Sequence, residues 1–181
     1  RVQHGGQGWS ARPILPVSRN EPLPLSFAQR RLWFLDQFEP GSSAYTIPVA
    51  ISLKGELKAA ALEWSLGEIV RRHEVLRTTF VTENDEPIQI ITPTTSFVLP
   101  VEDLTAVPAE QREGEARKRA QAEALCPFDL ATGPLLRARL LQLDAEEHVL
   151  LLTMHHIVSD GWSMGILFRE LSALYKAFSQ G

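Results

Sequence analysis

Hydrophobic and polar positions follow two periods along the chain, one typical of helices and one typical of strands. Four stretches are predicted to be helical from apolar residues at helical spacing or from a run of strong helix formers: Ser26–Phe38, Leu57–His73, Val107–Leu125 and Trp162–Phe178. Shorter alternating or continuously apolar stretches predict strands: Thr46–Leu53, Leu76–Thr82, Pro87–Thr92, a short one near Phe97–Val101, Leu135–Leu143 and His148–His155. This order of elements predicts an α/β fold with a mixed sheet packed with helices.

Turn and capping residues separate these elements. Ser26 is a plausible N-cap for the first helix, and Asn84 with Asp85 marks a hairpin turn between two predicted strands. Pro48 predicts an edge strand or a bulge, because proline cannot donate to a sheet ladder. The continuously apolar stretch Val149–Leu152 predicts a central strand that is buried on both faces.

The first 24 residues are predicted to be a linker, residues 1–24, ahead of a folded unit at residues 25–181. Glycines come first and prolines follow, and neither pattern suits a helix or a central strand. Ile14, Leu15 and Val17 could still pack as an extended strap. Because the chain does not begin with Met, we expect it to be a piece of a longer protein.

Composition excludes several classes of protein. A chain of 181 residues with 44% hydrophobic and 22% charged residues is ordinary for one folded domain. The net charge of -4 argues against nucleic acid as the main partner, because phosphate binding needs a basic face. One cysteine cannot form a disulfide within the chain, and no apolar run approaches the roughly 18 residues of a membrane span. We therefore expect a cytoplasmic protein with no membrane contact.

The segment Met154–Ser163 holds the main candidates for chemistry, because it joins a buried strand to a helix. Adjacent residues of a strand point to opposite sides, so at most one of His155 and His156 can face a given cleft. Three interpretations stand: a metal site of His155, His156 and Asp160, a core histidine with Asp160 as a helix cap, or acid–base chemistry by one histidine. Gly161 would supply backbone freedom at the turn.

A second cluster of candidates lies where a helix meets a strand. Arg71 and Arg72 can complement the negative end of the helix. Arg77 begins the strand beside a residue that we expect to be buried, Phe80, and a cation there needs an anion. Asp160 is the strongest candidate, so we predict a largely buried Arg77–Asp160 ion pair.

Cys126 could be considered a nucleophile that forms an acyl-enzyme. No histidine precedes it closely, and Pro127 follows it directly. A small buried residue at a helix end is the better interpretation.

Five segments together resemble the N-terminal lobe of a nonribosomal peptide synthetase condensation domain. They are Ser26–Leu35, Arg72–Phe80, Pro127–Leu130, Gly133–Arg137 and Met154–Ser163. The resemblance extends from about Pro13 to Gly181. It implies a chloramphenicol acetyltransferase-like lobe that forms half of a two-lobe, V-shaped domain, with the C-terminal lobe absent from this chain. It also implies that residues 1–24 link the lobe to an upstream carrier domain.

The resemblance implies an amide-forming reaction between two thioesters carried on phosphopantetheine arms. The donor aminoacyl or peptidyl group comes from an upstream carrier domain, and the attacking amine comes from a downstream carrier domain. His156 matches the family's catalytic histidine, as a general base or as a group that positions the amine. His155, Asp160, Gly161 and Arg77 match supporting residues, as does Arg72.

The resemblance also implies partners and alternatives. The expected partners are both carrier domains, the missing lobe and an adjacent adenylation domain, with no cofactor or metal bound by this domain. A related acyltransferase that uses a CoA thioester, an epimerisation domain, or a non-catalytic scaffold that docks carrier domains remains an alternative. The single lobe is expected to be inactive, because the second wall of the active-site channel is missing.

Overall fold

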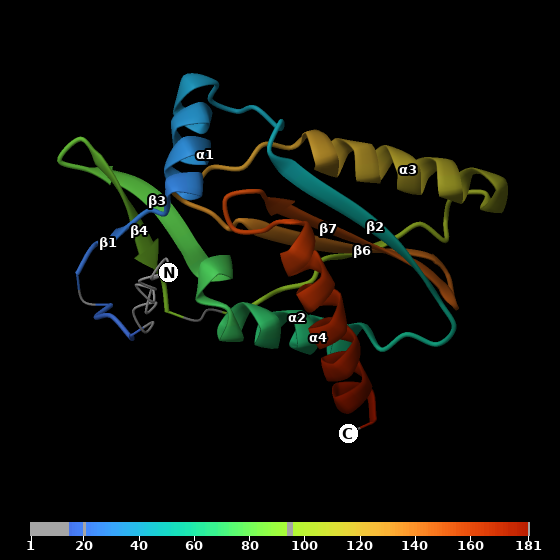
Figure 1. The fold of residues 1–181 in the computed structure, drawn as a ribbon. Helices are drawn as coiled ribbons and strands as arrows, with labels where there is room; N and C mark the ends of the chain where they lie inside the picture. Colours follow the sequence, from blue (N-terminus) through green and yellow to red (C-terminus); the bar gives the residue numbers. More distant parts are fainter. Residues whose placement is uncertain (1–14, 20, 94–95, 181) are drawn as a thin grey trace, which may run out of the picture.

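The computed structural model describes residues 15–19, 21–93 and 96–180, and helices alternate with strands along it (Figure 1). The helices are α1 (Phe27–Phe38), α2 (Ala59–Arg72), a short 3₁₀ helix η1 (Glu74–Arg77), α3 (Ala109–Leu125) and α4 (Gly161–Gln180). The strands are β1 (Leu23–Pro24), β2 (Thr46–Lys54), β3 (Thr78–Glu83), β4 (Glu86–Ile91), β5 (Val101–Asp103), β6 (Leu136–Asp144) and β7 (Glu147–His155). The predicted α/β class is confirmed.

The described strands form two sheets instead of the one mixed sheet that the sequence suggested. The larger sheet has the order β2-β7-β6-β5, with β5 parallel to β6 and the other neighbours antiparallel. The smaller sheet, β1-β4-β3, is antiparallel. It meets the segment before β6 through a hydrogen bond from the Phe80 N–H to the Leu130 carbonyl, 2.8 Å long. The smaller sheet therefore lies beside the larger sheet and does not add a strand to it.

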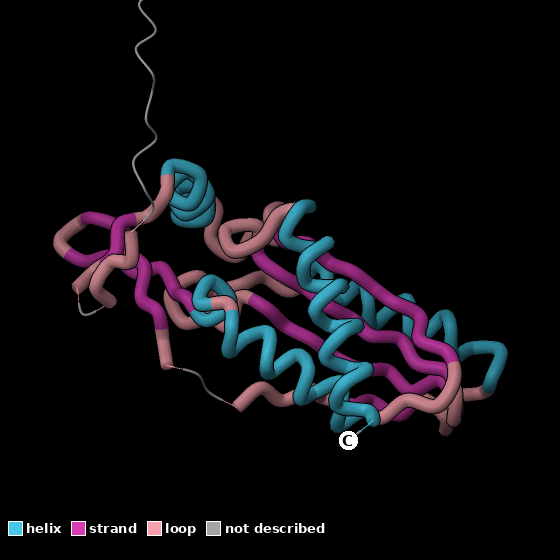
Figure 2. The backbone as a smooth tube through the Cα atoms, turned by 60° about the horizontal axis from the view of Figure 1, so that its bottom comes forward, coloured by secondary structure: helices cyan, strands magenta, loops and turns pink. Residues whose placement is uncertain are grey.

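Helices cover both faces of the larger sheet (Figure 2). Leu150, Leu152 and Met154 of β7 belong to the main core with α2 and α4, whereas Leu151 packs with Ala116 of α3 in a second cluster. Successive side chains of a strand leave opposite faces, so a strand with helices on both sides must be apolar at consecutive positions. This arrangement confirms the central, two-sided burial predicted for β7.

Local signals in the sequence explain where several elements begin and end. Ser26 accepts a hydrogen bond from the Gln29 N–H, and the Gln29 side chain accepts one from the Ser26 N–H, which is a complete capping box. Asn84 and Asp85 both adopt positive φ, as the two-residue turn between β3 and β4 requires. Pro48 lies in β2, at the edge of the larger sheet as predicted.

One expectation about burial is wrong, and one helix is more exposed than its apolar content suggests. Cys126, predicted to be buried, is exposed at the C-cap of α3. The first helix, α1, has no fully buried residue among its described positions, and Phe34 and Phe38 of its predicted apolar face are 61% and 72% exposed. Leu32 and Trp33 of the same helix are partly buried against the main core, so only part of the apolar surface of α1 is exposed.

The segment before α1 is tied to the lobe at two points. Ile14 lies outside the described residues, and Leu15 and Val17 are exposed, so these two do not pack as an apolar strap. Instead, the Arg19 guanidinium binds Glu74, and β1 pairs with β4. Within the described residues, no helix is long and apolar enough to cross a membrane.

Candidate active site

The two adjacent histidines leave opposite sides of the chain at the end of β7, as predicted. His155, the last residue of the strand, is buried at 3% exposure, whereas His156 is exposed. The alternation of a strand therefore packs one imidazole into the lobe and presents the other outside it.

His155 shapes the turn that carries His156. Its N–H donates to the Leu135 carbonyl at 3.1 Å, its carbonyl accepts the Val158 N–H at 3.1 Å, and its Nδ1 accepts the Ile157 N–H at 3.1 Å. Burial, together with the neighbouring His156, lowers the pKa of His155 to about 4. The ring is therefore neutral at neutral pH, and its proton sits on Nε2 because Nδ1 is an acceptor.

His156 lines an open groove of about 670 Å³ beside the first turn of α1. Its N–H donates to the Tyr45 carbonyl at 2.8 Å, which fixes the backbone at this point. The polar residues around it include Ser26, Gln29, Arg31, Tyr45, Asp160 and Ser163. An exposed imidazole on a fixed backbone can accept a proton from, or hydrogen-bond to, a group that enters this groove.

Asp160 caps α4 and does not pair with Arg77, so the predicted ion pair is wrong. The Asp160 carboxylate accepts hydrogen bonds from the N–H and hydroxyl of Ser163, at 2.8 and 2.7 Å, and these hold its pKa below its usual range. The residue is exposed, so it needs no buried counterion. Asp160 is the N-cap of α4, and its hydrogen-bond donor, Ser163, is only three residues away in the chain. This local capping interaction forms instead of an ion pair with a cation that is far away in the sequence.

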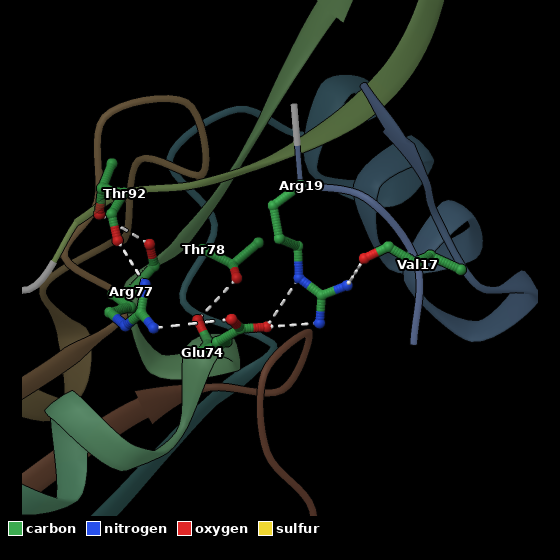
Figure 3. Close-up of polar contacts among 6 residues, drawn as sticks. All are labelled: Val17, Arg19, Glu74, Arg77, Thr78 and Thr92. Atoms are coloured by element: carbon green, nitrogen blue, oxygen red, sulfur yellow. Dashed lines mark hydrogen bonds and ion pairs between the residues drawn. The ribbon is translucent and has the colours of Figure 1, made fainter. Parts of the chain in front are cut away.

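Arg77 contacts Glu74 of its own 3₁₀ helix and Thr92, the residue that follows β4 (Figure 3). Its Nη1 donates to the Thr92 carbonyl at 2.6 Å, and its Nη2 lies 3.8 Å from Glu74 Oε1, while its Nε is buried without a partner among the described atoms. Glu74 also accepts two hydrogen bonds from Arg19, at 3.1 and 2.8 Å, which lower its pKa. Glu74 is a structural residue that the sequence analysis missed, although three-residue spacing to Arg77 was a signal for it.

Arg77 and Asp160 also belong to different cavities. Arg77 lines a cavity of about 510 Å³ between β3 and β6, whereas Asp160 lines the groove that holds His156. The two predicted supporting residues therefore line separate cavities.

Arg72 lies in the last turn of α2, where a cation complements the negative helix end as expected, whereas Gly161 does not supply the backbone freedom predicted for it. Arg72 pairs with Glu68 on the surface of α2 at 2.7 Å, beside a second pair from Arg71. These two arginines lower the pKa of Glu68 to about 2. Gly161 is the first residue of α4, and its φ is not positive, so its backbone conformation does not require glycine. A Cβ added at this position would meet open space.

The hydrogen bonds of His155 and Asp160 bear on the three interpretations of the segment Met154–Ser163, which were a metal site, a core histidine with a capping aspartate, and acid–base chemistry. Among the described residues, no group of three or more His, Cys, Asp or Glu side chains is placed to hold a metal ion. His155 uses Nδ1 within its own turn, and Asp160 uses its carboxylate on Ser163. The site thus presents one exposed imidazole, on a fixed turn, with no carboxylate hydrogen-bonded to that ring in the described part of the chain.

Comparison with known proteins identifies the family of this lobe. The family model described as "Condensation domain" matches residues 19–181. The chain belongs to the condensation-domain family. Linear gramicidin synthase subunits B and D of Brevibacillus parabrevis are 50% and 52% identical to it over 96% and 94% of its length. The chain spans about 3% of the length of each of these relatives.

Solved structures agree on the fold of this condensation-domain lobe. The starter condensation domain of the rhizomide synthetase RzmA matches with a TM-score of 0.82 and 27% identity, over 89% of this chain and 38% of that one. The first condensation domain of the calcium-dependent antibiotic synthetase matches with a TM-score of 0.80 and 28% identity, over 89% and 39%. The resemblance seen in the sequence motifs is thereby confirmed.

Proposed function

We propose that the protein containing this lobe forms an amide bond between two thioester-bound substrates during nonribosomal peptide synthesis. The observation that carries the proposal is His156, exposed on a fixed turn within a lobe of the condensation-domain family. The amine of a downstream aminoacyl thioester attacks the carbonyl of the donor thioester, the donor's C–S bond breaks, and the amine loses a proton. The products are an amide on the downstream carrier and a free thiol on the upstream one.

His156 receives or orients the proton of the attacking amine. The imidazole lines an open groove, where a substrate arm can approach it. Because the Asp160 carboxylate is hydrogen-bonded to Ser163, His156 acts without a hydrogen bond from its ring to this carboxylate, whose negative charge is still felt by the imidazole. Most of the rate gain then comes from bringing two tethered reactants together, with proton transfer adding to it.

The same proposal assigns partners and a missing half. The upstream and downstream carrier domains deliver both substrates on their phosphopantetheine arms, and an adenylation domain loads them. Residues 1–24 connect the lobe to the upstream carrier. The solved relatives extend well beyond the part that this chain matches, which supports a second lobe that closes the channel. This lobe alone is therefore expected to be inactive, and the domain itself binds no cofactor or metal.

The experiment uses the full-length protein with two separately loaded carrier domains and detects the amide product by mass spectrometry. The proposal expects product from the wild type, no product from residues 1–181 alone, and unchanged turnover in the presence of a chelator. If the wild type instead transfers an acyl group from a free CoA thioester, or epimerises a loaded substrate without forming an amide, the assignment is wrong.

A pH–rate profile of the chemical step separates the two roles of His156. A general base must lose its own proton before it acts, so the rate should rise with pH in the wild type and lose that rise in His156→Ala. An unchanged profile in the variant would reject the base and leave positioning as the role.

A further inference from the structure

Three rings, those of Tyr45, His155 and Phe128, form an aromatic cluster at the turn that carries His156. The Phe128 ring centroid lies 5.9 Å from that of His155, with the planes at 75°, an edge-to-face contact. The Tyr45 ring lies 6.4 Å from His155 at 59°. Phe128 and His155 are both buried, at 7% and 3% exposure.

Arg137 of β6 holds Phe128 through a further set of contacts. Its guanidinium carbon lies 3.8 Å from the centroid of the Phe128 ring, a cation–π contact. The same guanidinium donates to the carbonyls of Pro127 and Cys126, at 2.9 and 2.8 Å, and its Nε donates to Glu123 at 2.6 Å. Both the ring of Phe128 and the backbone just before it are therefore tied to one side chain that is itself held at several points.

The contact between the rings of Phe128 and His155 matters because His155 holds the turn together through its ring and its backbone. Its Nδ1 accepts the Ile157 N–H, and that bond forms only with the imidazole in one orientation. His156 lies between these two residues, and its own N–H is bonded to Tyr45 of the same cluster. A rotation of the His155 ring would therefore release the backbone on the far side of His156.

We propose that Phe128 is a positioning residue for His156, acting through the ring of His155. Reacting groups must be held closely, and a misplacement of about 1 Å can cost on the order of 10²-fold in rate. The inference rests on the proposed function for its kinetic consequence, whereas its structural part, the control of the turn by Phe128, stands apart from it.

The test compares Phe128→Leu with Phe80→Leu in the full-length protein. Phe80 is a matched control because it is a buried phenylalanine of the same core cluster, at 1% exposure, but lies in β3. Each variant loses one ring and keeps an apolar side chain, so both lower global stability. Only Phe128→Leu removes the ring that contacts His155.

Two measurements decide the inference. Hydrogen exchange at the amides of His156 and Ile157 should accelerate in Phe128→Leu at least tenfold more than exchange at the amides of β2, which reports the loss of global stability. The kcat of amide formation should fall tenfold or more, with KM for the loaded carriers unchanged. Phe80→Leu should show neither local effect.

Equal behaviour of the two variants in the exchange experiment would overturn the inference, because Phe128 would then be an ordinary core residue. A normal kcat in Phe128→Leu would overturn it as well. If the wild type forms no amide, the proposed function fails, and the exchange comparison still decides whether Phe128 controls the turn.

Discussion

Acidification should destabilise this lobe through one buried histidine, His155. Its pKa of about 4 in the folded chain lies below the 6.5 of an ordinary histidine. Between about pH 6.5 and pH 4, the His155 ring is mostly protonated in the unfolded chain but mostly neutral in the folded chain. Stability is therefore lost as the pH falls from about 6.5 toward about 4.

The magnitude follows from the two pKa values. The difference between a pKa of 6.5 in the unfolded chain and about 4 in the folded chain corresponds to a total loss of roughly 3 kcal/mol in the free energy of unfolding, at about 1.4 kcal/mol per pKa unit. This full loss is reached only below pH 4, where His155 is protonated in both the folded and the unfolded chain. Between pH 7 and pH 5 the linkage relation gives a loss of about 2 kcal/mol in the free energy of unfolding. This is a large share of the stability of an ordinary domain, about 5–15 kcal/mol.

Urea unfolding at pH 7, 6 and 5, followed by tryptophan fluorescence, measures this loss. His155→Asn keeps a side-chain acceptor for the Ile157 N–H but cannot titrate, so its unfolding free energy should change far less with pH over this range. His156→Gln is the matched control: it removes the smaller cause of the lowered pKa of His155 and leaves the burial, so most of the wild-type slope should remain. The carboxylates with lowered pKa values, such as Glu68, lose their contribution only below about pH 4.5, outside this range.

A wild-type unfolding free energy that is flat from pH 7 to pH 5 would refute the reasoning, since it would mean that His155 takes up a proton in the folded state. The same slope in His155→Asn as in the wild type would also refute it, by assigning the loss to another group.

Three further predictions concern contacts outside the buried core. Ser26→Ala should lower the unfolding free energy by about 1 kcal/mol in urea titrations, through loss of the capping box, and a change below about 0.3 kcal/mol would argue against that box. Glu74→Gln should speed tryptic cleavage after Arg19 at least threefold, whereas equal rates would mean that Arg19 is not held by Glu74. A double-mutant cycle of Arg77→Met and Asp160→Asn should give a coupling energy below about 0.5 kcal/mol, and a coupling near 3 kcal/mol would restore the ion pair rejected above.

The sequence predicted the elements well because local signals control them. The capping serine Ser26, the turn residues Asn84 and Asp85, and the two-sided apolar run of β7 each act over a few positions. Strand alternation is another local rule, and it was enough to assign His155 and His156 to opposite sides of the chain. The interior position of one ring and the exposed position of the other therefore follow from the residue pattern at the end of β7.

Long-range pairing could not be predicted in the same way. Asp160 was predicted as the anion for Arg77 because it had no evident local role beyond that of a helix cap, and Glu74 was not considered. In the fold, Glu74 lies one turn before Arg77 and contacts it, whereas the Asp160 carboxylate caps its own helix, α4. Likewise, the apolar spacing in α1 predicted a helix but not which surface covers its apolar side chains, and Phe34 and Phe38 are exposed.

The most direct test of the central claim is the single-turnover rate of amide formation by the full-length protein carrying His156→Ala, measured with both carriers loaded and saturating. The account predicts a rate about 10²–10⁴-fold below the wild type, with the affinity for each carrier unchanged. A rate within a factor of about ten of the wild type would contradict a catalytic role for His156 and leave the reaction to the proximity of the two tethered substrates.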